Sequence, residues 1–161
     1  MNRRIILITG GARSGKSSMA EKMALSLAPN PIYMATARIW DEEFRQRVLR
    51  HQQNRGPQWT NIEEEKQLSL HDCTGRVVLV DCLTLWCTNF FFDLSADVEQ
   101  ALQAAQAEFD RFTAQEATFL FVTNEIGSGG VSTDEVQRKF TDLQGWMNQY
   151  VAQRADEVYL M

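Results

Sequence analysis

The sequence predicts an α/β fold in which a mostly parallel sheet is flanked by helices. Short, mostly apolar runs at residues 5–8, 77–80 and 118–123 are typical of strands that are buried on both faces. Helix-forming segments separate these runs, and strands that alternate with helices join through right-handed crossovers into a parallel sheet. The chain has 161 residues and shows no internal repeat or low-complexity linker, so we expect one domain over residues 1–161.

The composition excludes several classes of protein. A hydrophobic content of 44% and a charged content of 23% are ordinary for a globular protein, and the net charge of −5 argues against general nucleic-acid binding. No apolar run is long enough to span a membrane, and the first strand begins too near the N-terminus to leave room for a signal peptide. We therefore expect a cytoplasmic protein. The three cysteines lack zinc-type spacing and are expected to be buried thiols: Cys73, Cys82 and Cys87.

The first strand leads into a phosphate-binding loop. Residues 10–17 fit the pattern G-x-x-x-x-G-K-[ST], and a helix-forming run over residues 18–28 follows directly. Glycines let the backbone N–H groups turn inward, and the start of the helix adds positive potential for phosphates. Lys16 is expected to reach the β- and γ-phosphates, and the Ser17 hydroxyl to bind Mg²⁺. The fold is therefore expected to be of the P-loop NTPase type, with a loop made of Gly10, Gly11, Ala12, Arg13, Ser14, Gly15, Lys16 and Ser17.

The remaining elements follow from periodicity and from the residues that end each segment. Pro29 and Pro31 end the first helix, and Gly56 with Pro57 ends the second. In chain order we predict a strand over 32–37, a helix from the acidic residues 41–43 to about residue 55, a short helix within 58–75, a strand over 77–81, an apolar segment 82–92 that crosses the sheet edge, a helix over 95–116, a strand over 118–123, a helix over 134–154 and a strand over 157–161.

Two features follow the carboxyl ends of predicted strands, where α/β proteins bind ligands. Asp81 ends the strand over 77–81 and is expected to be the second Mg²⁺ ligand beside Ser17; the alternative is a helix cap or turn residue. The glycine-rich segment 127–130 follows the strand over 118–123. It is either a mobile loop that closes over a substrate or a flexible surface turn.

His51 is one of two histidines and shares a helix face with Phe44 and Val48, at spacings i, i+4 and i+7. Taken alone, this pattern favours a hydrogen-bonded histidine at the edge of the core. Several arginines nearby instead suggest a phosphate-binding face, unless they are solvated and pair with acidic residues 41–43: Arg38, Arg45, Arg47, Arg50 and Arg55. The other histidine, His71, belongs to no motif and is expected to be structural or at the surface.

Three motifs together point to one family. They are GGARSGKS at residues 10–17, YMATA at residues 33–37, and R-x-x-x-H-x-x-x-R-x-x-x-W-x-x-x-E from Arg47 to Glu63. Residues 122–127 and 155–158 extend the match over essentially the whole chain. In these motifs the sequence resembles the bifunctional adenosylcobinamide kinase / adenosylcobinamide-phosphate guanylyltransferase family.

The resemblance implies two reactions. A nucleoside triphosphate, ATP or GTP, phosphorylates the corrinoid substrate adenosylcobinamide; GTP then guanylylates a histidine, which passes GMP to the cobinamide phosphate. The matching histidine is His51, and the family also implies Mg²⁺ and a homotrimer. Beyond residues 10–17, the implied nucleotide contacts are Ala35, Thr36, Ala37, Gln52, Gln53, Asn54, Arg55, Glu63 and Asp81.

The chemistry of the residues agrees with these reactions. A neutral imidazole is nucleophilic near pH 7, while Lys16, Mg²⁺ and arginines would neutralise charge on a leaving pyrophosphate. Two other functions remain open: a small-molecule kinase in which His51 is structural, and a nucleotide-dependent switch. Guanine-specific switches usually carry Asn-Lys-x-Asp after a strand, whereas residues 123–126 of this chain read Thr-Asn-Glu-Ile. The sequence shows no evident general base for the kinase step.

Overall fold

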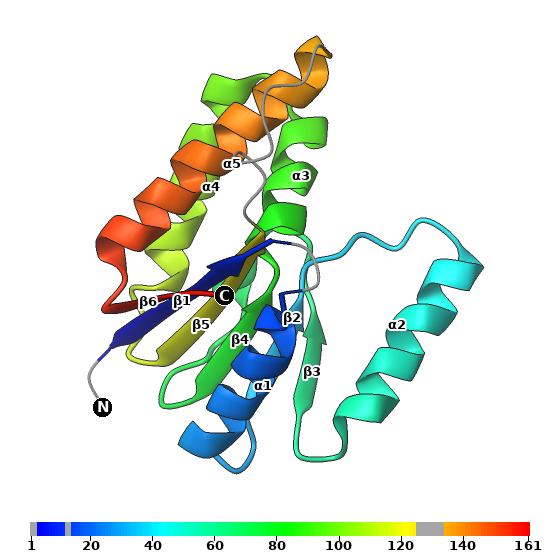
Figure 1. Ribbon diagram of the computed structural model, residues 1–161, viewed down its shortest axis with the longest axis vertical. Coiled ribbons are helices and arrows are strands. Elements are labelled where there is room, and N and C mark those ends of the chain that lie inside the picture. The colour runs from blue at the N-terminus through cyan, green and yellow to red at the C-terminus, as the bar shows by residue number, and fades with distance from the viewer. Residues whose placement is uncertain (1–2, 12–13, 125–133) are drawn as a thin grey trace.

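The computed structural model describes residues 3–11, 14–124 and 134–161. Six strands form one sheet in the order β3-β2-β4-β5-β1-β6, and every neighbouring pair is parallel, which confirms the predicted α/β class (Figure 1). The strands are β1 (Arg4–Gly10), β2 (Ile32–Ala35), β3 (Thr60–Glu63), β4 (Val77–Asp81), β5 (Thr118–Asn124) and β6 (Glu157–Leu160).

Helices cover both faces of the sheet, but unequally. Figure 1 shows α3, α4 and α5 on one face and α1 on the other, while α2 stands apart beyond the β3 edge. The helices are α1 (Lys16–Leu27), α2 (Glu42–Arg55), α3 (Leu83–Asp93), α4 (Val98–Phe112) and α5 (Glu135–Arg154), with a 3₁₀ turn at Leu68–Leu70. Within the described ranges, no helix is both long and apolar enough to cross a bilayer.

The aliphatic run in β1 is explained by burial on both faces. Ile5 and Leu7 join the larger hydrophobic core beneath α3, α4 and α5, while Ile6 and Ile8 join a smaller core beneath α1. Alternate residues of a strand point to opposite faces, so a strand covered on both sides needs an unbroken apolar sequence.

The sequence did not predict β3. Residues 58–75 were expected to hold only a short helix, yet Thr60–Glu63 pairs in parallel with β2, with Ile32 opposite Thr60. This edge strand alternates between half-buried and exposed residues and contains an asparagine, which disfavours strands. The pairing with β2 therefore determines its structure.

Residues 82–92 were expected to be a packed segment that crosses the sheet edge; they are packed into the core, but they do not cross the edge. Leu83–Asp93 forms the helix α3, whose N-terminal cap is Cys82. Trp86, Cys87 and Phe91 are all buried in the larger core, and Phe91 packs edge-on against Phe140 of α5. A helix buried on most sides is apolar on most sides, and for this reason it shows no amphipathic period.

Candidate active site

The parallel sheet brings the predicted site residues to one edge. Ala35 is in register with Glu63 on one side and with Asp81 on the other. Further along the same edge, Gly10 is in register with Asn124, and the loop that leads to α1 starts at Gly10. Segments far apart in the sequence therefore end beside one another at the carboxyl edge, which is where α/β proteins bind ligands.

Two glycines of the segment between β1 and α1 are required for different reasons: Gly10 leaves no room for a side chain, and Gly15 has a positive φ. A Cβ on Gly10 would lie 2.7 Å from Ser14 Oγ and 3.0 Å from the Met161 carbonyl oxygen, and Gly15 adopts a φ of 84° at the start of α1. Lys16 is 8% exposed, and its Nζ donates a hydrogen bond of 2.9 Å to the Gly11 carbonyl oxygen. Ser14 Oγ is buried and has no partner among the described residues, so it is available to a bound phosphate oxygen. Ala12 and Arg13 lie outside the described residues.

A cavity of about 550 Å³ opens between α1, the sheet edge and α2. Ser17 and Asp81 line it from the α1 and β4 side, and His51 lines it from α2. The predicted metal ligands and the predicted nucleophile therefore lie in one cavity. The full lining is Ser17, Glu21, Tyr33, Ala35, Ala37, Phe44, Val48, His51, Asn54, Arg55, Asp81 and Leu85.

His51 lies on α2, a helix that contributes no buried side chain to the hydrophobic core. All residues of α2 are described, and none of them is buried. The side chain of Asp41 caps the helix by accepting a hydrogen bond of 2.7 Å from the Phe44 backbone N–H. Phe44 and Val48 do share a face with His51, but this face lines the cavity rather than the core. His51 is exposed and has no hydrogen bond or ion pair within the described part of the chain, so it is not a hydrogen-bonded core histidine.

Asp81 is held by Tyr33. The Tyr33 hydroxyl donates a hydrogen bond to Asp81 Oδ2, and the cap of α3 is Cys82, so Asp81 is not the helix cap. The guanidinium carbon of Arg55 lies 3.4 Å from the centre of the Tyr33 ring. The rings of Tyr33 and Trp59 pack edge-on, with their centres 5.7 Å apart. Burial and the Asp81 carboxylate raise the pKa of the Tyr33 phenol, which therefore stays protonated and remains a hydrogen-bond donor.

Sequence reasoning missed Glu21 and Tyr33. Glu21 lies four residues after Ser17, so helical spacing alone places it on the same face of α1. Burial raises the pKa of the Glu21 carboxyl, with a smaller contribution from Asp81, while Arg55 and His51 oppose the shift. Tyr33 gave no such signal, because its contact with Asp81 depends on the pairing of β2 with β4.

Several predicted contact residues do not face this cavity. Thr36 is fully buried; its hydroxyl donates to the Cys82 carbonyl oxygen at 2.8 Å and accepts from the Cys82 N–H at 3.0 Å. Its own carbonyl accepts from Asn89 Nδ2 at 2.8 Å. Gln52 and Gln53 are not part of the cavity lining, whereas Asn54 and Arg55 are. Arg47 stacks over Phe44, with its guanidinium carbon 5.4 Å from the ring centre.

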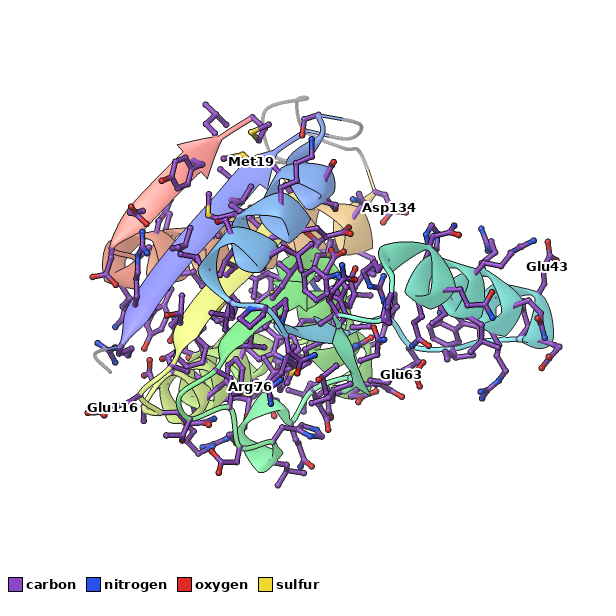
Figure 2. The ribbon with its side chains drawn as sticks, turned by 90° about the horizontal axis from the view of Figure 1, so that it is seen from below. Met19, Glu43, Glu63, Arg76, Glu116 and Asp134 are labelled. Carbon is purple, nitrogen blue, oxygen red and sulfur yellow. The ribbon has the colours of Figure 1, made fainter. Side chains whose placement is uncertain are left out.

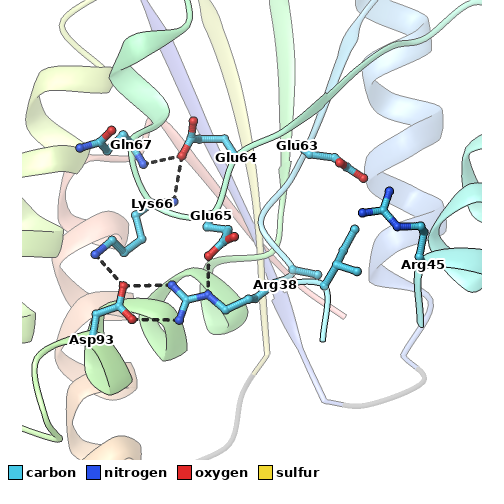
Figure 3. A pocket seen from close by; sticks show the side chains of 10 residues that line it. Arg38, Arg45, Glu63, Glu64, Glu65, Lys66, Gln67 and Asp93 are labelled. Atoms are coloured by element: carbon cyan, nitrogen blue, oxygen red, sulfur yellow. Dashed lines mark hydrogen bonds and ion pairs between the residues drawn. The ribbon is translucent and has the colours of Figure 1, made fainter. Parts of the chain in front are cut away.

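Glu63 lines a second cavity of about 690 Å³, which shares Ala37 with the first (Figure 3). Figure 3 shows Glu63 and Arg45 pointing toward one another across it. Below them, Arg38 donates two hydrogen bonds to Asp93, at 2.9 and 3.0 Å, and Lys66 Nζ lies 2.7 Å from Asp93 Oδ2. Arg38 and Lys66 hold the pKa of the Asp93 carboxyl well below its usual range.

His71 and the segment 127–130 are the two remaining features that the sequence analysis singled out. His71 Nε2 lies 2.9 Å from Glu64 Oε1, and His71 is not among the residues that line the cavity with His51. The glycine-rich segment 127–130 lies outside the described residues, so neither interpretation of it is tested.

The cavity offers oxygen ligands that suit Mg²⁺. The described ranges contain no group of three or more histidine, cysteine or carboxylate side chains that would hold a metal ion by themselves. Mg²⁺, however, usually keeps several waters and takes only one or two protein ligands together with phosphate oxygens. The Ser17 hydroxyl and the Asp81 carboxylate, with a triphosphate on the loop, match that requirement.

A family model and three known proteins that resemble this chain all indicate the same family. Residues 6–161 match the family described as "Cobinamide kinase / cobinamide phosphate guanyltransferase". The chain is 36% identical to the bifunctional adenosylcobalamin biosynthesis protein CobP of Pseudomonas aeruginosa, with 94% of this chain and 89% of the relative covered. It is 37% identical to the Escherichia coli protein CobU, which carries the same description, and 33% identical to that of Salmonella typhimurium; in both cases 98% of this chain and 94% of the relative are covered.

Proposed function

The chain belongs to the cobinamide kinase / cobinamide phosphate guanyltransferase family, and from this premise we propose that both reactions take place in the cavity between α1 and α2. The protein is an enzyme with kinase and guanylyltransferase activities. The observation that supports a single site is that Ser17, Asp81 and His51 line the same cavity, with Lys16 next to Ser17 at the start of α1.

In the kinase reaction, residues 10–17 bind a nucleoside triphosphate, and the γ-phosphate passes to a hydroxyl of the corrinoid, adenosylcobinamide. Lys16 places its positive charge beside the β- and γ-phosphates, where charge develops during transfer. Ser17 and Asp81 would hold Mg²⁺, which neutralises phosphate charge when bound. ATP and GTP are both proposed donors.

In the guanylyl transfer, His51 attacks the α-phosphorus of GTP. A nitrogen–phosphorus bond forms, the bond between the α-phosphorus and the bridging oxygen breaks, and pyrophosphate leaves. The imidazole loses its ring proton to solvent. The phosphate of the cobinamide phosphate then displaces the histidine and takes the GMP. His51 is exposed and has no hydrogen-bond partner among the described residues, which supports this role, because no hydrogen bond to them has to break before it attacks.

We also propose that the enzyme is a homotrimer, as the family resemblance implies. The support from the structure is the helix α2, which projects from the body and buries none of its residues (Figure 2). Beside it, Trp40 is 70% exposed. A helix gains most of its stability from packing, so a second chain against α2 would supply what its own chain does not.

The test compares two histidine variants. His51→Ala should retain phosphorylation of cobinamide with a γ-labelled triphosphate and lose guanylyl transfer from GTP by a factor of about 1,000 or more, because the covalent intermediate cannot form. His71→Ala is the matched control and should retain both activities, since His71 pairs with Glu64 outside the cavity. Guanylyl transfer by His51→Ala at the wild-type rate would refute the proposed nucleophile.

A further inference from the structure

We propose that Tyr33 is a positioning residue that supports both reactions: it orients the Asp81 carboxylate and at the same time anchors the helix that carries His51. The inference rests on the function proposed above for Asp81 and His51. Tyr33 lies on β2, between β4, which ends in Asp81, and β3, which follows α2 in the chain (Figure 1).

The first contact fixes the carboxylate. The Tyr33 hydroxyl donates to Asp81 Oδ2, and no hydrogen bond to Asp81 Oδ1 occurs within the described part of the chain. An aspartate side chain rotates easily about its last bond, so one firm hydrogen bond selects an orientation. Tyr33 is only 8% exposed, and its phenol is therefore held by the protein rather than by solvent. Partners of this kind determine how well a ligand residue binds a metal.

The second contact fixes α2. Arg55 is in the last turn of the helix, and its guanidinium carbon lies over the Tyr33 ring, 3.4 Å from the ring centre. Arg55 Nη2 also donates to Asn61 Oδ1 at 2.9 Å, which ties the guanidinium to β3. Because α2 buries none of its residues, the stacked Arg55 is an attachment of this helix to the sheet.

Both contacts are made by one ring. The hydroxyl of Tyr33 donates a hydrogen bond to Asp81, while the face of the ring contacts the guanidinium of Arg55, which lies four residues after His51. The carboxylate and the nucleophile are therefore positioned from the same side chain. Removing the hydroxyl alone separates the two roles, because phenylalanine keeps the ring.

The protein contains a matched control for this arrangement. Tyr150 on α5 donates from its hydroxyl to Asp110 Oδ2 at 2.6 Å, and the guanidinium carbon of Arg154 lies 3.4 Å from its ring centre. The same three residue types thus make the same two kinds of contact, although here only the hydrogen bond joins α4 to α5, and the ring contact lies within α5. Tyr150→Phe removes an equivalent hydrogen bond without touching the cavity with His51.

The experiment measures metal binding directly, with Mn²⁺ as the probe and a non-hydrolysable GTP analogue present. Electron paramagnetic resonance of free Mn²⁺ should show that Tyr33→Phe weakens binding about tenfold or more, while Tyr150→Phe leaves it unchanged. In steady-state assays, Tyr33→Phe should lower kcat in both reactions with the KM for the corrinoid unchanged. Equal Mn²⁺ affinity in Tyr33→Phe and the wild type would overturn the inference.

A second variant tests the anchor. Tyr33→Leu removes the ring as well, and guanylyl transfer should fall further than phosphorylation, because only the former needs His51. Equal losses in the two activities relative to Tyr33→Phe would overturn the anchoring role. The Mn²⁺ result does not depend on a covalent intermediate, so failure of the His51→Ala test and failure of the Tyr33→Phe test are distinguishable.

Discussion

Lys16, Asp81 and His51 differ in how firmly the protein holds them, and the difference matches the chemistry proposed for each. Lys16 is buried and bonded to the Gly11 carbonyl, so its charge is fixed in place near the loop. Asp81 accepts a hydrogen bond from Tyr33 at one oxygen. His51 is exposed and stands on a helix without buried residues. Fixed charges suit electrostatic stabilisation, and an unpaired imidazole suits nucleophilic attack.

The role of Lys16 is tested by replacement with a neutral side chain of similar length. Lys16→Met should lower kcat about 100-fold or more in both reactions, because the charge that stabilises the transferring phosphate is lost. Lys22→Met, an exposed position on the same helix, is the control and should leave both activities within twofold of the wild type. The measurement is phosphate and guanylyl transfer with labelled nucleotides, beside circular dichroism of the fold. Wild-type kinase activity in Lys16→Met would contradict the account.

At the scale of elements, α2 is positioned by contacts at its two ends. The segment before it carries Arg38, which binds Asp93 at the end of α3, and Lys66 binds the same carboxylate. Its last turn carries Arg55, which lies on Tyr33. Because the helix buries no side chain of its own, these polar contacts replace the apolar packing that holds the other helices.

The Asp93 ion pairs predict a dependence of stability on pH. The folded pKa of Asp93 is lowered by Arg38 and Lys66, so their stabilising effect is complete well above the unfolded pKa of about 4 and is lost as the pH falls through the folded value. Asp93→Asn should therefore lower the free energy of unfolding at pH 7 by about 0.5–1 kcal/mol, since the side chains are partly exposed.

Urea unfolding at several pH values measures this difference. The gap between the wild type and Asp93→Asn should be widest near pH 7 and should narrow below about pH 4. Glu116→Gln, an exposed position outside the ion pairs, should show no comparable gap. A gap that stays constant between pH 7 and pH 3 would mean that the Asp93 charge does not stabilise the fold.

These elements also show what could be predicted from the sequence. The buried strands and the loop before α1 were predicted because aliphatic runs and glycine spacing report local structure directly. β3 was missed because pairing with β2, not its own residues, makes it a strand. α3 was missed because a helix buried on most sides has no apolar stripe. Tyr33 was missed because its partner Asp81 lies 48 residues away and meets it only through the pairing of β2 with β4.

At the scale of the whole molecule, the cavity lies at the sheet edge and α2 forms one of its walls. Figure 2 shows α2 extending well away from the rest of the protein, with Glu43 near its far end. Because α2 buries none of its residues, only a few polar contacts hold this wall of the cavity in position. Packing of α2 against another chain would fix that wall, and this links the proposed homotrimer to the site.

The proposed homotrimer predicts the mass in solution. Light scattering after size-exclusion chromatography should give a mass of three chains of 18.4 kDa each. Leu49→Glu, on an exposed apolar position of α2, should shift the mass toward one chain, whereas Leu70→Glu, exposed on the 3₁₀ turn, should leave it unchanged. A wild-type protein that elutes with the mass of one chain would contradict the proposed assembly.

The proposed guanylyl transfer depends on a covalent bond between His51 and GMP, and isolating that bond is the decisive experiment. The protein is incubated with GTP labelled at the α-phosphate and with Mg²⁺, then digested, and the labelled peptide is sequenced by mass spectrometry at alkaline pH, where a phosphoramidate survives. We expect an acid-labile, alkali-stable guanylyl group on His51, present in His71→Ala and absent in His51→Ala. A protein that transfers GMP to the corrinoid without a labelled peptide, or with the label on another residue, would contradict this expectation.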